Sequence, residues 1–253
     1  MPIKIIPYKS QALTKHRNGA LEENKPIGFT ADMKAVRPYS NLFYWANTWT
    51  DMGSEVSKHP HQGFEIFTYV LSGVWEHFDE SKNKWMSLAP GDVHIIRAGS
   101  GISHSEKFHP DTQVFQIWFD PNLKKSLAIP SSYQIIPADK FYTEEIPNLT
   151  SKIICDAEWD TPLKLSTEKI TIRDNKITPG HKSYKLDPSL YYSWYLLKGE
   201  LEINNKIIRK NDFFIVKGED KFDFHVSRHA RLFVISSPIR PNYNTYLELK
   251  SRN

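Results

Sequence analysis

This 253-residue sequence has one cysteine, no long apolar run and little net charge, and each of these features excludes a class of protein. The single cysteine, Cys155, excludes an intrachain disulfide and suits a reducing compartment, so we expect a cytoplasmic protein. Because Cys155 follows two isoleucines in an apolar run, we expect a buried thiol there rather than a nucleophile.

No segment approaches the roughly 20 consecutive apolar residues that a membrane-spanning helix needs. The segment from Met1 to Pro7 has no apolar stretch of signal-peptide length, so we expect neither export nor a membrane partner. The 33 basic and 29 acidic residues give a formal charge of +4 and are mixed along the chain. That mixture predicts a solvated surface rather than a nucleic-acid site.

Aromatic and β-branched residues are abundant instead. The sequence contains 7 Trp, 12 Tyr and 14 Phe, which is ample material for a packed core. Short runs of these residues recur between turn signals, a pattern typical of an all-β chain. Little helix is expected, and 11–23 is the segment where we place a short one. The clearest predicted strands are 42–45, 65–71, 74–78, 93–96, 114–119, 194–197, 201–203, 213–216 and 232–235.

An internal repeat indicates two related β-barrels. The stretch from Tyr69 to Glu76 has a partner from Tyr195 to Glu202, and further similar pairs follow in the same order. We therefore expect an N-terminal barrel over residues 1–130 and a C-terminal barrel over residues 131–253. Residues 131–150 contain prolines and few strand signals, and we interpret them as a linker.

Two histidines separated by one residue, His59 and His61, begin the candidate site. Side chains alternate faces along a strand, so this pair shares one face, and His104 and Glu106 share a face of a second strand. Two such pairs can converge across a barrel interior. Three imidazoles and a carboxylate suit Fe(II), Mn(II), Ni(II), Cu(II) or Zn(II) and leave positions open for substrate or dioxygen. On spacing alone, four hydrogen-bonded polar side chains near a barrel mouth are an equal alternative.

Ordered motifs surround these residues. They are His59-Pro60-His61-Gln62-Gly63-Phe64-Glu65, Thr68-Tyr69-Val70-Leu71 followed by Gly73, Glu76-His77, Pro90-Gly91-Asp92, and Ala98-Gly99, Gly101-Ile102 and His104-Ser105-Glu106. This series resembles the pirin family of the cupin superfamily. Gln62 and His94 depart from that pattern, in which Arg and Gln are common, so the resemblance does not fix the pocket rim or the substrate.

The resemblance implies a fold and a ligand set. The fold is all-β, with two cupin-type jelly-roll barrels in one chain, and the N-terminal barrel binds one metal. The implied ligands are His59, His61, His104 and Glu106, and we expect Fe(II), with Mn, Ni, Cu and Zn as alternatives. Glu65 shares the face of His59 and His61 and is the alternative carboxylate, but the resemblance favours Glu106.

The second barrel lacks this set. The repeat places Lys185 opposite the first ligand and Asp187 opposite the second, and neither side chain replaces an imidazole. His181, His225 and His229 occur nearby without a His-x-His pair. We expect no metal there, and a role in packing, pocket closure or partner contacts.

The resemblance implies two candidate functions. The first is a dioxygenase similar to quercetin 2,3-dioxygenase, which takes dioxygen and a flavonol or another small aromatic enol, with Glu106 as the catalytic proton acceptor. The second is a metal-binding, redox-sensing regulator that binds a protein partner without turnover. No separate motif supports the second. His77 and His94 either line the cavity, where His94 could orient substrate or act as an acid or base, or are hydrogen-bonded structural imidazoles.

Overall fold

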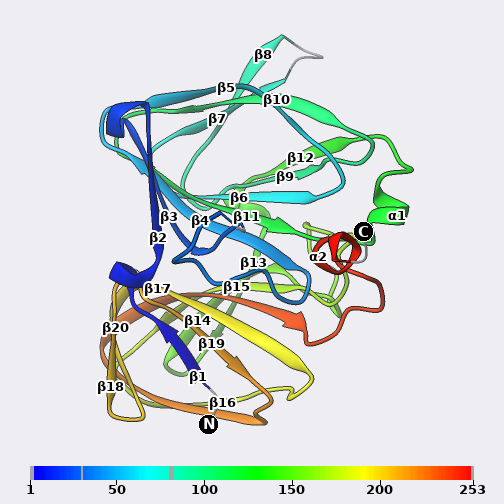
Figure 1. Ribbon diagram of the computed structural model, residues 1–253. Coiled ribbons are helices and arrows are strands. Elements are labelled where there is room, and N and C mark those ends of the chain that lie inside the picture. The colour runs from blue at the N-terminus through cyan, green and yellow to red at the C-terminus, as the bar shows by residue number, and fades with distance from the viewer. Residues whose placement is uncertain (1–2, 30, 80–82, 252–253) are drawn as a thin grey trace. The chain divides into compact units, whose positions relative to one another are not determined.

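The computed structural model describes residues 3–29, 31–79 and 83–251, and nearly all of its regular elements are β-strands (Figure 1). The predicted all-β class is confirmed. Helices are short, and they are η1 (Tyr8–Ser10), η2 (Arg17–Gly19), α1 (Leu123–Ser126), η3 (Ala138–Lys140) and α2 (Tyr246–Lys250). No helix in the described part of the chain is long and apolar enough to span a membrane.

The chain divides into two compact units. Ala12–Lys140 with Asn242–Asn253 form one, called here the site unit, and Met1–Gln11 with Phe141–Pro241 form the other, the C-terminal unit. This division differs from the expected boundary between residues 130 and 131. The middle crossing follows Lys140, residues 1–11 belong to the C-terminal unit, and residues 242–253 belong to the site unit.

Two sheets build the site unit, and they are packed through a buried apolar cluster. Val70 and Val114 of the larger sheet belong to one cluster with Trp75 and Phe108 of the smaller. The smaller sheet has the order β5-β10-β7-β8, and the larger has the order β12-β9-β6-β11-β4-β3-β2. The strands are β2 (Ala12–His16), β3 (Leu21–Ile27), β4 (Leu42–Thr50), β5 (Ser54–His61), β6 (Glu65–Ser72), β7 (Trp75–Asp79), β8 (Lys84–Leu88), β9 (Val93–Arg97), β10 (Ile102–Phe108), β11 (Thr112–Phe119) and β12 (Ser132–Ile136).

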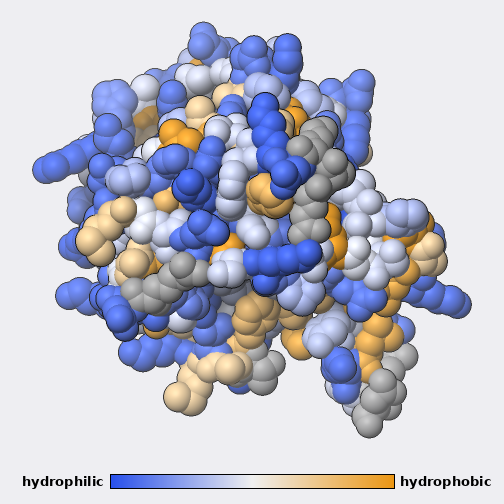
Figure 2. All heavy atoms as spheres, turned by 90° about the horizontal axis from the view of Figure 1, so that it is seen from above, coloured by the Kyte–Doolittle hydropathy of each residue, from blue (hydrophilic) through white to orange (hydrophobic). Residues whose placement is uncertain are grey.

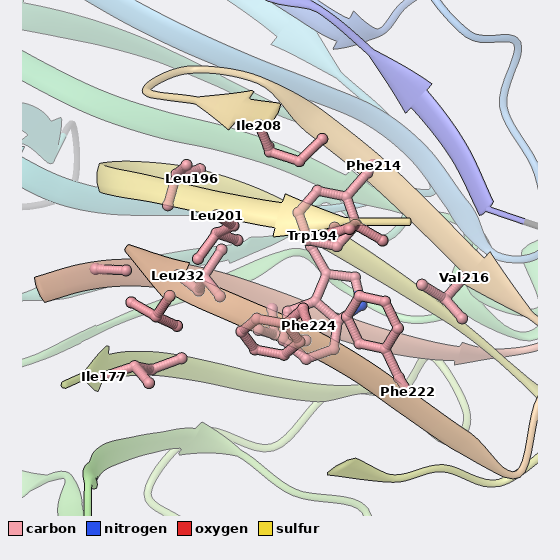
Figure 3. Packing of buried hydrophobic residues seen from close by; sticks show 14 of the residues in the cluster. Ile177, Trp194, Leu196, Leu201, Ile208, Phe214, Val216, Phe222, Phe224 and Leu232 are labelled. Carbon is pink, nitrogen blue, oxygen red and sulfur yellow. The ribbon is translucent and has the colours of Figure 1, made fainter. Parts of the chain in front are cut away.

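One nine-stranded sheet forms the C-terminal unit. Its longest strands each pair with several neighbours, and this lets the sheet enclose a core in which Trp194 lies against Phe214 and Phe222 (Figure 3). The strands are β1 (Ile3–Ile6), β13 (Tyr142–Ile146), β14 (Leu149–Cys155), β15 (Thr171–Ile177), β16 (Gly180–Lys185), β17 (Leu190–Ile203), β18 (Lys206–Arg209), β19 (Phe213–Lys217) and β20 (Lys221–Pro238). Cys155 is a buried thiol, as expected.

One expectation for local structure is wrong, and a second is incomplete. Residues 11–23 hold no α-helix but form β2 and the start of β3, which pair as a hairpin around Asn18 and Gly19. Both turn residues have positive φ, which Asn and Gly tolerate best, so the Asn-Gly pair was the informative signal. The expected linker at 131–150 contains the crossing between the two units after Lys140, but it also forms β12, β13 and the first residues of β14, and its prolines lie outside these strands.

The repeat is visible in two equivalent glycines. Gly73 and Gly199 have φ of +72° and +92°, and a Cβ at either would lie 2.5 Å from a backbone atom, of Thr112 and His229 respectively. Both positions therefore need glycine for the same two reasons, conformation and close approach.

The surface is mainly hydrophilic where it can be seen. On the face shown in Figure 2, hydrophilic side chains predominate and apolar ones are scattered among them. Isolated apolar residues of this kind are ordinary on a protein surface.

Candidate metal centre

The candidate site begins with the pairing of β5 and β10. His104 lies directly opposite His59, and Ile102 lies opposite His61. Further along, Glu106 pairs with Val56, so Ser57 and Lys58 together oppose a single residue. This is a β-bulge, and its two residues are exposed while Val56 and His59 on either side are half-buried. The bulge thus turns the two histidines of β5 towards the interior.

The three histidines converge. Their ligand atoms all lie within 4.8 Å of one another, and within the described residues they form the group of three or more that could hold a metal ion. The ring centroids of His59 and His104 are 4.4 Å apart, and those of His61 and His104 are 5.1 Å apart. The site also reaches across to the larger sheet, because the His61 ring meets the edge of Trp118 on β11 at 4.9 Å.

Each imidazole has a nitrogen available for a ligand. His59 donates its Nδ1 proton to the Ser57 carbonyl at 2.9 Å across the bulge, which leaves Nε2 as the lone-pair nitrogen. The Nε2 atoms of His61 and His104 are buried and have no hydrogen-bond partner. A buried nitrogen without a partner is costly, and coordination of a metal would remove that cost.

Burial favours the neutral form of His61 and His104. It lowers the pKa of His61 to about 4, with a further contribution from the charge of His59. Burial, and then His59 and His61, lower the pKa of His104 well below its ordinary value. A neutral imidazole is the form that coordinates a metal, so His61 and His104 are suited to a divalent transition metal at neutral pH.

Glu106 lies beside this group but not within it. Its Oε1 is 3.6 Å from His104 Nε2 and accepts a hydrogen bond from Gln116 Nε2 at 2.9 Å. Burial, and then the charge of Glu23, raise the pKa of Glu106 to about 8, against the opposing effect of the Gln116 hydrogen bond. A carboxylate in this place would gain from a nearby cation, and Glu106 stays our predicted fourth ligand.

Glu65, the alternative carboxylate, has a different partner. It is buried at the start of β6, directly opposite Arg97 on β9, and its Oε1 lies 3.7 Å from Arg97 Nε. A carboxylate committed to an arginine is less available to a metal. The pairing favours a structural role for Glu65.

A second layer of histidines lies behind the first. His77 on β7 is buried, and its Nδ1 is 3.3 Å from Nδ1 of His104. His94 is fully buried, its ring lies 4.5 Å from that of His77, and neither of its nitrogens has a hydrogen-bond partner. His77 therefore has the structural hydrogen bond that we allowed for, and His94 has none. In the register of β7 and β10, His77 is opposite Glu106, so strand parity could have placed it on the site face.

An aromatic cluster stands beside the ligands, and we did not anticipate it from the sequence. Trp118 is its centre, within 6.5 Å of the rings of Phe29, Phe43, Tyr44 and Phe64. The α2 residue Tyr246 adds its ring against Phe43 and Phe64. The signal was present as scattered single aromatics, which are ordinary core residues until the fold brings them together.

The histidines of the C-terminal unit do not join a comparable group. His181, His225 and His229 are exposed, and among the described residues none belongs to a cluster of three potential ligands. Lys185 and Asp187 are exposed too, and the inward positions beside them belong to Tyr184 and Leu186. Our placement of Lys185 and Asp187 opposite the two histidine ligands is therefore shifted by one residue.

Comparison with known sequences identifies the region that holds this site. Residues 13–119 match the family model described as Pirin. The Pasteurella multocida protein PM1685 is 29% identical over 182 residues, which cover 70% of this chain and 73% of that protein. Quercetin 2,3-dioxygenase of Escherichia coli K12 is 40% identical over 74 residues, but these cover only 28% of this chain and 32% of the enzyme.

Solved structures share the fold of the whole chain. The bacterial pirin YhhW from Escherichia coli, crystallised in complex with nickel(II), has a TM-score of 0.77 at 20% identity and covers 93% of this chain and 99% of its own. Quercetin 2,3-dioxygenase from Acinetobacter baumannii has a TM-score of 0.76 at 18% identity and covers 99% and 86%. At such identities the likeness shows the fold alone and not the chemistry.

Proposed function

Residues 13–119 of this chain belong to the pirin family, and from that premise we propose that the site unit is an Fe(II)-dependent dioxygenase acting on a flavonol or another small aromatic enol. One observation carries the proposal: three imidazoles, two of them with buried Nε2 atoms that have no hydrogen-bond partner, converge beside an aromatic cluster. His59, His61 and His104 would hold the metal, with Glu106 as the fourth ligand.

The bound metal would supply Lewis acidity that lowers the pKa of an enol hydroxyl, and redox chemistry for dioxygen. The chain's own residues have separate tasks. Glu106 accepts the hydroxyl proton, and Gln116 holds its carboxylate in place through the 2.9 Å hydrogen bond. Trp118 offers its indole beside His61 as a surface for the substrate ring. Holding the reactants together in this way lowers the entropic part of the barrier.

The names of the relatives support the substrate class. One relative is named quercetin 2,3-dioxygenase, and so is one of the structures that share the fold. A bacterial pirin with the same fold was crystallised with nickel(II), so metal binding is compatible with this scaffold and the identity of the ion must be measured.

The test combines metal analysis with oxygen uptake. Protein purified without chelator is analysed for metal, loaded anaerobically with Fe(II), and followed with an oxygen electrode on addition of quercetin. We expect uptake that is abolished in His59→Ala and in Glu106→Gln. His181→Ala is the matched histidine control, because His181 is exposed in the other unit, and it should behave as wild type.

The same experiment separates the alternatives. A protein that loads fully with metal and consumes no oxygen with quercetin or related enols would favour the redox-sensing regulator that binds a protein partner. A protein that binds no transition metal would refute both functions. Loss of metal in Glu65→Gln but not in Glu106→Gln would reassign the carboxylate ligand.

A further inference from the structure

The C-terminal unit contains a cavity of its own, of about 640 Å³. Volumes of this order are typical of sites for small organic molecules. The cavity is lined by Leu149, Ser151, Asp156, Ala157, Glu158, Lys169, Thr171, Arg173, Asn175, Tyr184, Lys185, Leu186, Asp187, Ser189, Leu190, Tyr192, Trp194, Val234 and Ser236. All of these residues belong to the C-terminal unit.

Part of the cavity lining belongs to the strand that corresponds, in the repeat, to the strand of His59 and His61. In the site unit, His59 of β5 lies opposite His104 of β10. In the C-terminal unit the corresponding pair of strands is β16 and the first part of β20, where Tyr184 lies opposite Phe222. An aromatic pair thus replaces a pair of ligands, and Tyr184 faces the cavity and packs edge-on against Trp194 at 5.7 Å.

Part of the inner face of the sheet is polar. Ser151 of β14 is directly opposite Asn175 of β15, and Thr171 of β15 is directly opposite Ser236 of β20. Residues directly opposite each other in an antiparallel pair share a face, so these four side chains gather on one surface. The apolar core adjoins them on the same face, because Trp194 lies opposite Val234, between Ser236 and Leu232 of the same strand.

Three of the cavity-lining side chains have polar atoms without a partner. Ser151 Oγ, Asn175 Oδ1 and Trp194 Nε1 are buried and make no hydrogen bond. The residues are 2%, 3% and 2% exposed, respectively. Each such group costs about 1–3 kcal/mol when it is left unsatisfied. Two acceptors, one of them a hydroxyl that also donates, and one indole donor are therefore available to a bound molecule.

The charges at the rim favour a neutral molecule. Lys169, Lys185 and Arg173 line the cavity together with Asp156, Glu158 and Asp187, so the two signs balance. The arginine is already paired, because its Nη2 lies 3.1 Å from the Asp156 carboxylate.

We propose that this cavity binds a neutral hydroxylated aromatic compound, with its ring against Tyr184 and Tyr192 and its hydroxyl groups bonded to Asn175 and Ser151. The proposal does not rest on the function of the metal centre. It assigns to the second barrel a ligand site of its own, in which aromatic stacking and hydrogen bonds replace coordination.

The test is calorimetry on the full chain with His59→Ala as the background, after treatment with chelator, so that binding at the metal centre does not contribute. The probes are resorcinol, cyclohexane-1,3-diol and benzoate, which separate the aromatic ring, the hydroxyl groups and a negative charge. We expect resorcinol to bind at least about tenfold more tightly than the other two.

Variants then locate the binding. Ser151→Ala and Asn175→Leu should each weaken resorcinol binding by about tenfold, the effect of one lost hydrogen bond. Ser237→Ala is the matched control, because Ser237 also has a buried hydroxyl without a partner but does not line the cavity. Thermal unfolding establishes that each variant folds, and Ser151→Ala, the smaller change, serves alone if Asn175→Leu does not fold.

Three results would overturn the proposal. They are the absence of resorcinol binding, tighter binding of benzoate, and unchanged affinity in the folded Ser151→Ala variant. None of them bears on oxygen uptake at the metal centre, so failure here is distinguishable from failure of the proposed function.

Discussion

The Nδ1 atoms of His77 and His104 lie 3.3 Å apart in the interior of the site unit. Only one of the two nitrogens can carry the proton of this hydrogen bond. If His104 binds a metal through Nε2, its Nδ1 must be protonated, and His77 must then accept. His77 is thus a positioning residue that selects the tautomer and orientation of a ligand.

We predict that His77→Ala weakens metal binding by about tenfold to 100-fold, the usual effect of losing such a partner. Competition with a chromophoric chelator measures the affinity. His77→Gln should restore part of it, because the Gln amide oxygen can accept the same proton. An equal loss in both variants would argue against the hydrogen bond, and His109→Ala, which changes a half-exposed imidazole paired with Glu76, is the control.

Glu106 gives the metal-free protein a characteristic pH dependence. Burial raises its pKa in the folded state to about 8, while an unfolded glutamate titrates at 4.5. Below the lower value the carboxyl group is protonated in both states and has no effect. Between the two values only the unfolded chain releases its proton, so stability falls as the pH rises and levels off above the higher value.

We therefore predict that metal-free Glu106→Gln is more stable than the metal-free wild type at pH 7, by roughly 3 kcal/mol, and equally stable at pH 4. Urea unfolding of chelator-treated protein at both pH values measures this difference. Glu76→Gln provides a control of opposite sign. Although burial alone would raise the pKa of Glu76, hydrogen bonds from Ser87 and His109 lower it, so this variant should lose stability at neutral pH. A Glu106→Gln variant that is less stable at pH 7 would contradict the burial argument.

The equivalent glycines allow a matched comparison. We predict that Gly73→Ala and Gly199→Ala each destabilise their unit by more than about 3 kcal/mol, because a left-handed conformation and a backbone clash combine. Gly218→Ala should cost only about 1–2 kcal/mol, since Gly218 has φ of +67° but no heavy atom within 4 Å of an added Cβ. Chemical denaturation compares the three, and equal losses would mean that the close approaches are relieved by small backbone shifts.

The C-terminal helix α2 is docked on the site unit through polar and aromatic contacts. The Tyr246 amide donates to Asp120 at 2.6 Å, and the Tyr246 ring lies against Phe43 and Phe64. We predict that Tyr246→Ala lowers the unfolding free energy of the site unit by about 2 kcal/mol, because half-buried aromatic area is lost. Leu249→Ala is the control, since Leu249 is exposed on the same helix. Hydrogen exchange should show faster exchange of residues 246–250 in Tyr246→Ala only.

The convergence of His59, His61 and His104 was predictable, because strand parity and an ordered motif both act over short distances. The bulge at Ser57 and Lys58 was not, since nothing in the sequence marks two consecutive exposed residues on β5 as opposing one residue of β10. Tertiary pairing decides such irregularities.

The second barrel shows how one residue changes an interpretation. The repeat aligns the two hairpins that begin at Tyr69 and Tyr195. The chain between the preceding strand and the hairpin differs in length by one residue in the two units, so the same spacing counted back from the hairpin ends on Lys185 and Asp187. The structure shows Tyr184 and Leu186 facing inward instead. In a strand a shift of one residue exchanges the two faces, so a charged pair was expected where an aromatic and an aliphatic residue lie.

The exchanged chain ends restrict how this protein can be divided. The chain passes from one unit to the other after Gln11, after Lys140 and after Pro241. A split at the middle crossing would leave each fragment carrying an element that the opposite unit needs, β1 in one piece and α2 in the other. Neither fragment contains all the residues of one unit, so neither is expected to fold alone. The two units must therefore be expressed and engineered together.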